Sequence, residues 1–312
     1  MAVITRADRY RSGHASDVAR IGRTTGRSLV LLALGGLLLV FIGLPIVALF
    51  ANLPWSQLGA ALGDPQAQLA VKTSLFSASV STAVLAVLGV PLGYLLAQYR
   101  FPGRGFINAI VYMPLVLPPV VGGVLLLLVW GNSGTVEQFL APHNIYFVNE
   151  LSGIILCQMF VSAPFVVVAA RSAFERLDPD LDEAARSMGA DTLQVFWLVA
   201  VPLSARAIMA GLVLSWMRAF GEFGATAIVA YHPFSFPVYL YQQLSTVGFT
   251  PVLPMTLMAV VLGAVVLALA AVLERAGAIA AVAQSMGRTR ARTSGLGSET
   301  ANEPGRGVKL EW

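Results

Sequence analysis

Few side chains in this 312-residue sequence could carry out chemistry, and most of them lie far apart. Arg218 and Glu222 are the exception, because they stand four residues apart inside an apolar run and would share one face of a helix. Cys157, the single cysteine, lies in a different apolar run, and the three histidines are too far apart in sequence to form a metal-binding motif. The candidate chemistry is therefore electrostatic rather than catalytic, and we expect neither a metal site nor a cofactor site in this chain.

The elements that would position this pair are transmembrane helices. Hydrophobic residues make up 57% of the sequence and charged residues 12%, whereas soluble domains carry about 25% charged residues. The apolar residues fall in blocks long enough for a spanning helix of about 20 residues. We therefore predict an all-α polytopic membrane protein with six spans, at residues 28–50, 73–97, 107–130, 151–170, 208–230 and 252–273.

The distribution of cations predicts the orientation of these spans. Eighteen of the twenty Lys and Arg residues lie before the first span, after the second, after the fourth or beyond the sixth. The loops 51–71, 131–150 and 231–250 contain none. Because positively charged loops stay in the cytoplasm, we expect a multi-pass protein of the cell membrane with both termini cytoplasmic. The basic residues are dispersed without interleaved aromatics, so they do not indicate nucleic-acid binding.

This topology divides the chain into three parts. Residues 1–27 would form a cytoplasmic tail, and residues 28–275 a transmembrane domain that includes a cytoplasmic hairpin at 171–206. Residues 276–312 would form a second cytoplasmic tail, which we expect to be disordered beyond residue 285.

The hairpin is delimited by helix-capping residues. Asp178 precedes a proline and predicts a helix start, and Gly189 stands where a helix needs a left-handed terminal residue. Asp191 and Gln194 then form the pattern of a capping box, which starts a second helix that runs until Pro202 bends it towards the fifth span. Small residues let another surface approach closely, so we interpret the hairpin as a docking element. The alternative is a loop that merely reconnects two spans.

Two features inside the spans each allow two interpretations. Arg218 would lie roughly 16 Å from the cytoplasmic end of its span, where ionisable groups face a bundle interior or an aqueous cavity. We favour a structural ion pair of Arg218 with Glu222 that fixes helix packing. Pro114, Pro118 and Pro119 predict a kinked helix in the third span. The kink either serves bundle packing or lines a pathway, and the sequence does not decide between the two.

The hairpin resembles the EAA motif of ABC importer permeases. That motif reads Glu-Ala-Ala, three residues, Gly, nine residues, Ile-x-Leu-Pro, and the matching residues here are Glu183, Ala184, Ala185, Gly189 and Pro202. Val199 and Val201 replace the Ile and Leu of the motif. The resemblance covers roughly residues 70–275 and implies the fold of a type I permease. It also implies that the hairpin forms coupling helices that insert into a cleft of an ATPase subunit.

Two further segments narrow the resemblance. Residues 114–131 and 218–231 are similar to the corresponding stretches of molybdate and tungstate permeases. Sulfate permeases share the Gly-Glu-Phe-Gly-Ala core of the second segment but usually differ in the first. The resemblance therefore implies transport of molybdate or tungstate, with sulfate or thiosulfate as the alternative. In such a protein, Arg218 has a second possible role, which is to define the route of the dianion.

The resemblance also implies partners. These are two copies of an ABC ATPase, a second copy of this permease, and an extracytoplasmic oxyanion-binding protein at loops 131–150 and 231–250. The chain has no phosphate-binding glycine–lysine loop, so ATP-Mg would be used by the partner ATPase and this subunit would not be an enzyme itself. An intramembrane enzyme is the alternative of another class, but the spans offer few reactive groups for one. An energy-independent channel would have no use for the hairpin.

The topology can be tested by labelling single cysteines in a Cys157→Ser background with a membrane-impermeant reagent. Cysteines at Gln57, Ser133 and Ser245 should react from outside intact cells, because they lie in loops that lack cations. Cysteines at Ser172 and Ser285 should react only after the membrane is permeabilised. A single inverted result would contradict the six-span topology.

Overall fold

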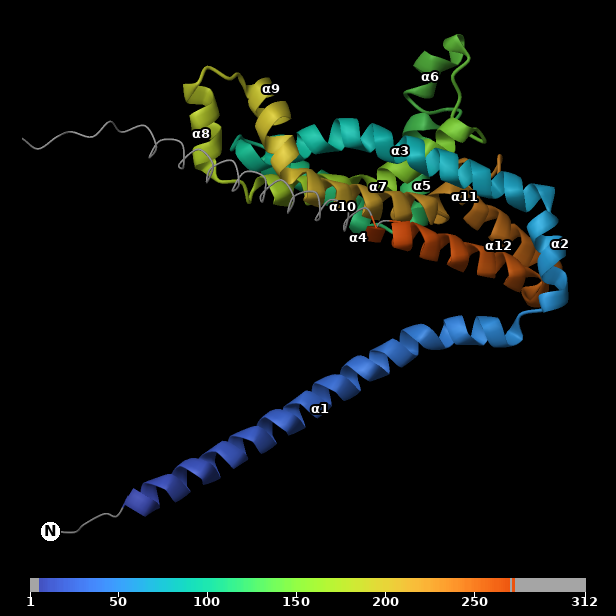
Figure 1. The fold of residues 1–312 in the computed structure, drawn as a ribbon. Helices are drawn as coiled ribbons and strands as arrows, with labels where there is room; N and C mark the ends of the chain where they lie inside the picture. The colour runs from blue at the N-terminus through green and yellow to red at the C-terminus, as the bar shows by residue number, and fades with distance from the viewer. Residues whose placement is uncertain (1–5, 270, 273–312) are drawn as a thin grey trace, which may run out of the picture.

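A computed structural model describes residues 6–269, 271 and 272, with side chains from residue 29 onward. Every regular element in this part of the chain is helical (Figure 1). The predicted tail 276–312 lies outside the described residues. Five helices are long and apolar enough to span a membrane: Leu29–Asn52 within α1 (Arg6–Asn52), α3 (Pro65–Gln98), α7 (Leu151–Phe174), Thr192–Phe220 and Phe249–Leu269. The all-α class predicted from the sequence is confirmed.

Shorter elements complete the bundle. They are α2 (Leu58–Gly63), α4 (Arg104–Val116), α5 (Pro119–Trp130), α6 (Glu137–Leu140), α8 (Pro179–Ser187), α9 (Thr192–Val195), α10 (Val201–Phe220), α11 (Gly224–Val229) and α12 (Phe236–Val247). Helices α8 and α9 stand together at one end of the long helices, which we call the hairpin end (Figure 1). Helix α2 lies at the opposite end, and α6 projects sideways from the bundle.

The core of the bundle is built from α3, α7 and α10, which pack closely through small residues. A Cβ at Gly93 of α3 would lie 2.8 Å from the Cβ of Ala170 on α7, so only glycine allows this approach. Ser81 of α3 lies with its hydroxyl oxygen 3.0 Å from Oε1 of Gln158 on α7. Ser215 of α10 donates a hydrogen bond to a backbone carbonyl of α7 at 3.3 Å. Small residues and interhelical hydrogen bonds are what hold helices together in lipid, where apolar side chains gain nothing by leaving the solvent.

A polar contact fastens the opposite end. Asp64 caps α3 by accepting a hydrogen bond from the backbone of Gln66 at 3.0 Å. Its other carboxylate oxygen accepts a hydrogen bond from the hydroxyl of Tyr239 on α12 at 2.5 Å. Burial and the contact with Asp64 raise the pKa of Tyr239 to about 12, so the hydroxyl keeps its proton and continues to donate at physiological pH. The contact ties α12 to the start of α3.

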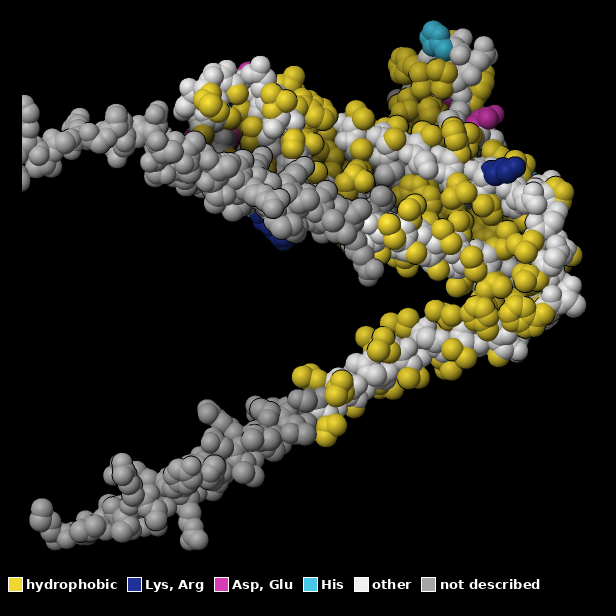
Figure 2. Space-filling view, viewed as in Figure 1, with side chains coloured by type: hydrophobic (Ala, Val, Ile, Leu, Met, Phe, Trp, Pro, Cys, Tyr) yellow, Lys and Arg dark blue, Asp and Glu magenta, His cyan; other side chains and the backbone are white. Residues whose placement is uncertain are grey.

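The C-terminal end of helix α1 contacts the bundle, and the rest of the helix runs away from it (Figure 1). Leu49 in its last turn and Leu53, the residue after its end, pack against Leu253 and Leu257 of the last described helix. Between Leu29 and Phe50 nearly all of its large apolar side chains are exposed, and Figure 2 shows them along the helix. An apolar helix of this length, exposed on all sides, fits lipid or another protein chain rather than water.

Two of the predicted spans differ from the structure. The third, 107–130, is not one helix: α4 ends at Val116 and α5 begins at Pro119, because proline restricts the residue before it to an extended backbone and removes a helical hydrogen bond. The fifth predicted span, 208–230, begins and ends later in the sequence than the helix that the structure shows there. Helix α10 already starts at Val201 and ends at Phe220, and α11 follows after a break of three residues.

Candidate functional site

The first arm of the hairpin, α8, forms as its capping residues predict. Asp178 accepts a hydrogen bond from the backbone N–H of Asp180 at 3.1 Å, which satisfies one of the free donors at a helix start. Gly189 follows the helix with φ +90, a left-handed conformation that a residue with a Cβ adopts only under strain. Nothing lies within 4 Å of a Cβ built at Gly189, so its exposed turn is open to a partner.

The second arm begins with the predicted capping box. The backbone N–H of Gln194 donates to Asp191 at 2.8 Å, and that of Asp191 donates to Gln194 at 2.9 Å. The chain turns where the second arm meets α10 (Figure 1), close to Pro202, as the sequence predicts. The helix passes through one π-helical turn, Phe196–Ala200, into α10, where Pro202 occupies the first turn. Pro202 lacks an N–H donor, and a π-helical turn is a local adjustment that lets a helix accommodate such a residue. The second arm and α10 therefore share a continuous helical backbone that changes direction between them (Figure 1).

The residues that match the EAA motif are distributed over the surface and the base of the hairpin. Glu183 and Ala184 are exposed on α8, whereas Ala185 is buried. Pro202 is exposed, and Val199 and Val201 are half-buried at the foot of the second arm. The motif therefore has an outer part that a partner can reach and an inner part that anchors the hairpin.

Large apolar side chains cover the outside of the hairpin. Met188 is 84% exposed at the end of α8, and Leu193, Trp197 and Leu198 are exposed on the second arm. Figure 2 shows these hydrophobic surfaces over the upper part of the hairpin. An exposed apolar patch surrounded by polar residues marks an interaction site. Leu193, Trp197 and Leu198 were not among the predicted docking residues, although an apolar run in a segment already assigned to the surface was an available signal.

An aromatic cluster joins the hairpin to the bundle. The ring of Tyr94 on α3 lies 5.2 Å from that of Phe174 on α7 and 5.0 Å from that of Phe196 in the π-helical turn. The rings of Phe174 and Phe196 are 6.1 Å apart. Phe174 and Phe196 are buried, and such ring pairs add to the free energy of packing beyond their buried area. These three residues are far apart in the sequence, so spacing could not reveal the cluster.

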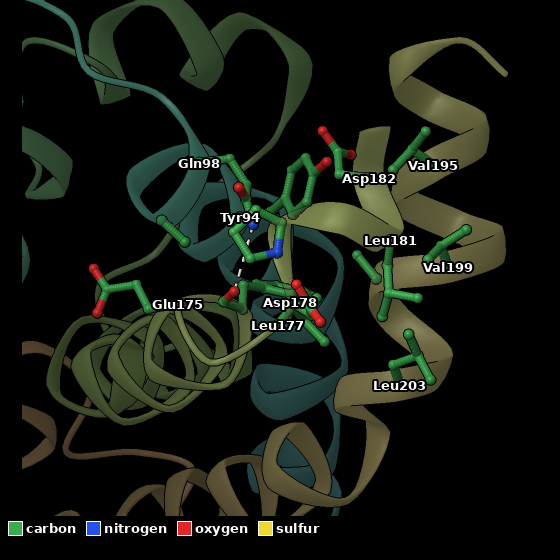
Figure 3. A pocket seen from close by; sticks show the side chains of 14 residues that line it. Tyr94, Gln98, Glu175, Leu177, Asp178, Leu181, Asp182, Val195, Val199 and Leu203 are labelled. Carbon is green, nitrogen blue, oxygen red and sulfur yellow. Dashed lines mark hydrogen bonds between the residues drawn. The ribbon is translucent and has the colours of Figure 1, made fainter. Parts of the chain in front are cut away.

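A cavity of about 160 Å³ lies between this cluster and α8. Figure 3 shows Tyr94 and Asp182 facing it from α3 and α8. Asp182 forms an ion pair with Arg186 at 2.9 Å, and the pKa of Arg186 is raised by hydrogen bonds with Asp182 and Tyr99. The ion pair between Asp182 and Arg186 therefore stabilises the first arm. The cavity beneath α8 leaves this helix space to move relative to α3.

Arg218 and Glu222 form an ion pair, as their spacing predicts. The Arg218 Nη1 lies 2.7 Å from Oε2 of Glu222, and Glu222 is 1% exposed whereas Arg218 is 28% exposed. The other oxygen of Glu222 accepts a hydrogen bond from the backbone N–H of Ala225 at 2.8 Å. Glu222 therefore pins the start of α11 to the end of α10. This double use of Glu222 supports a structural role for the pair, while the partial exposure of Arg218 leaves a face of its guanidinium open.

The two helix breaks lie against each other. A Cβ at Gly224 would lie 2.8 Å from Pro119 Cβ and 3.2 Å from the backbone nitrogen of Val120. A Cβ at Gly123 would lie 3.0 Å from the Cα of Ala225. The third span, interrupted by Pro118 and Pro119, and the segment after Arg218 therefore meet directly at membrane depth. Pro114 stands within α4 without interrupting it.

The ion pair allows a thermodynamic test. Glu222→Ala should lower the free energy of unfolding by about 3–5 kcal/mol, because it strands Arg218 and removes the cap of α11. Arg218→Ala should cost less, since Arg218 is partly solvated, and the double variant should be more stable than Glu222→Ala alone. Thermal unfolding of the purified protein measures this order. If Arg218→Ala proves fully stable yet abolishes function, its role is in the pathway and not in the fold.

Comparisons with known proteins agree with this architecture. A probable molybdenum ABC transporter permease protein of Haloferax volcanii is 40% identical over 253 residues, which covers 80% of this chain and 92% of that protein. The molybdate/tungstate transport system permease protein WtpB of Pyrococcus abyssi is 34% identical and covers 69% of this chain and 83% of its own length. The sulfate transport system permease protein CysT of Salmonella typhimurium is 36% identical over 60% of this chain and 69% of its own length.

Solved structures share the fold at low identity. A bacterial ABC transporter involved in the import of alginate superposes with a TM-score of 0.68 at 19% identity, over 82% of this chain and 97% of that chain. The methionine ABC transporter MetNI gives 0.54 at 20% identity, over 66% of this chain and 94% of that chain. The pattern of the binding-protein-dependent transport system inner membrane components matches residues 89–277, which is more than half of the chain. The chain is therefore a member of that family of membrane transport components.

Proposed function

We propose that this chain is the transmembrane permease subunit of an ATP-driven ABC importer that translocates a tetrahedral oxyanion, molybdate or tungstate. The observation that carries the proposal is the 40% identity with the probable molybdenum permease of Haloferax volcanii over 92% of its length. The two segments that resemble molybdate and tungstate permeases, 114–131 and 218–231, also form one structural unit. They do so because α5 and the start of α11 pack directly on each other.

The proposal includes an orientation and a set of partners. The hairpin end faces the cytoplasm, where two copies of an ATPase bind the exposed residues of α8 and the second arm. A second copy of this permease completes the pathway on a two-fold axis. An extracytoplasmic binding protein docks at the opposite end, on loops 131–150 and 231–250. ATP-Mg is bound and hydrolysed by the ATPase, and this chain carries no cofactor.

The geometry supports a mechanism of coupling by rigid connection. Closure of the ATPase pair on ATP would move the two hairpins, and the second arm would transmit that motion because its helical backbone passes through the π-helical turn into α10 without an intervening loop. The aromatic cluster of Tyr94, Phe174 and Phe196 would pass the same motion to α3 and α7. ATP binding can favour one access state only if the two states bind the ATPase differently, and the hairpin supplies that difference.

Sulfate is the second candidate, and the similarity to CysT supports it. Sulfate, molybdate and tungstate are all tetrahedral dianions, so a pathway built for one presents suitable charges to the others. Discrimination among these three ions would then depend on the size of the ion and on the selectivity of the binding protein.

Uptake measurements test the substrate. Cells that express the permease with its ATPase and binding protein should accumulate radioactive molybdate, and excess unlabelled tungstate should suppress this uptake. Sulfate at the same excess should leave most of it intact. If sulfate suppresses uptake as strongly as tungstate does, the sulfate alternative replaces the proposal. If no oxyanion is taken up, the proposed function is wrong.

Substitutions in the hairpin test the ATPase contact. Glu183→Lys should leave folding intact, because Glu183 is exposed, but it should release the ATPase during co-purification or uncouple hydrolysis from uptake. Gly189→Asp should do the same and should also strain the turn by about 1 kcal/mol.

Gly103→Asp is the matched control, since Gly103 also has φ +90 with nothing near its Cβ but lies outside the hairpin. The control should assemble and transport normally. Equal loss in Gly103→Asp and Gly189→Asp would mean that backbone strain, and not docking, causes the defect. Normal transport by both hairpin variants would refute the docking assignment.

A further inference from the structure

An open groove runs between α7 and α10 at the hairpin end, separate from the cavity beneath α8. Its volume is about 470 Å³. Leu177 and Leu203 line both hollows and therefore stand between them. Neither the EAA motif nor the contact between the two helix breaks accounts for this groove.

Small residues line much of the groove. They include Ala169 and Ala173 of α7 and Ala207, Ala210 and Gly211 of α10. The two helices touch at this seam, because a Cβ at Gly211 would clash with that of Ala169, so the open space lies beside a packed contact. A tetrahedral ion of five heavy atoms fits this space with its first hydration partners.

Polar groups converge on this hollow. Ser172 of α7 and Arg176, which lies just after α7, line it together with Arg206 and Ser204 of α10. Ser204 is 5% exposed, and its hydroxyl has no hydrogen-bond partner among the described residues. Arg176 forms no ion pair within the described part of the chain. A buried hydroxyl without a partner is costly, so its presence beside two guanidinium groups indicates a position prepared for an acceptor with negative charge.

The groove also leads towards the buried ion pair. Leu214 is the lining residue furthest along α10 from the hairpin. Arg218 stands four residues further on, on the same face of the helix. A face of α10 thus carries Arg218 at membrane depth, small lining residues below it, and Arg206 nearer the hairpin end.

We propose that this groove is a binding site for a tetrahedral oxyanion at the hairpin end, occupied as the ion leaves the pathway. The proposal rests on the proposed function for the identity of the ion and for the assignment of this end to the cytoplasm. Charge-assisted hydrogen bonds from Arg176 and Arg206, with donation from Ser172 and Ser204, match the four oxygens of such an ion. The phosphate of an anionic lipid has the same chemistry, but the free ion is the species that the transporter itself brings to this face.

Protection from labelling tests the site directly. In the complex of permease and ATPase, reconstituted in phosphatidylcholine nanodiscs without nucleotide, a cysteine at Ala207 in a Cys157→Ser background should react with a maleimide. Tungstate should slow this reaction, and chloride at equal ionic strength should not. Arg176→Gln and Ser204→Ala should each raise the tungstate concentration for half-protection by about tenfold. Arg176→Lys should restore part of the loss.

Arg100→Gln is the matched control, because Arg100 is an exposed arginine between α3 and α4 that does not line the groove. It should leave the protection unchanged. Absence of protection by tungstate, or protection that both groove variants retain, would overturn the proposal. Protection by phosphatidylglycerol in the nanodisc but not by tungstate would assign the groove to lipid and would also overturn it.

The two proposals fail separately in these experiments. If wild-type cells take up oxyanion but tungstate does not protect the groove, the transport function stands and the groove site is wrong. If tungstate protects the groove in a complex that takes up no oxyanion, the site stands and the proposed function is wrong.

Discussion

The need to satisfy every backbone polar group inside hydrocarbon governs this structure. A continuous helix meets that need by itself, whereas a helix that stops at membrane depth does not. Two helices stop there, α4 at Val116 and α10 at Phe220. Glu222 supplies the missing acceptor at the start of α11, and the close contact of Gly224 with Pro119 and Val120 shields the start of α5. The two segments that resemble stretches of molybdate and tungstate permeases, 114–131 and 218–231, thus contain helix breaks whose backbone depends on its neighbours.

The same logic separates the rigid from the movable parts of the hairpin. Its second arm is joined to α10 through a continuous helical backbone that includes a π-helical turn. Its first arm is joined through the turn at Gly189 and rests on a cavity. π-helical turns often occur at functional positions because they displace side chains by a fraction of a turn. Here the displaced segment carries Phe196, which closes the aromatic cluster with Tyr94 and Phe174.

Charge along α10 follows a gradient that suits an anion. Arg218 lies at depth with its charge largely balanced by Glu222, whereas the groove nearer the hairpin end is lined by two arginines of which Arg176 has no described ion-pair partner. In the proposed pathway, partial cancellation of the Arg218 charge by Glu222 would favour passage of an anion over its retention. The structural role of the Arg218–Glu222 pair and the proposed role in transport are therefore compatible.

Local features of this protein were determined by the sequence alone. Most of the spans were predictable because each is a single apolar run of the chain. The caps of the hairpin and the Arg218–Glu222 pair were predictable because each depends on residues within about one helical turn. Pro118 and Pro119 predicted a kink in the third span. The contact of this interruption with Gly224 could not be predicted from the sequence. Only the tertiary structure brought together those two breaks, the rings of Tyr94, Phe174 and Phe196, and the walls of the groove. These features join residues far apart along the chain, and their geometry depends on how helices cross, which periodicity and spacing do not encode.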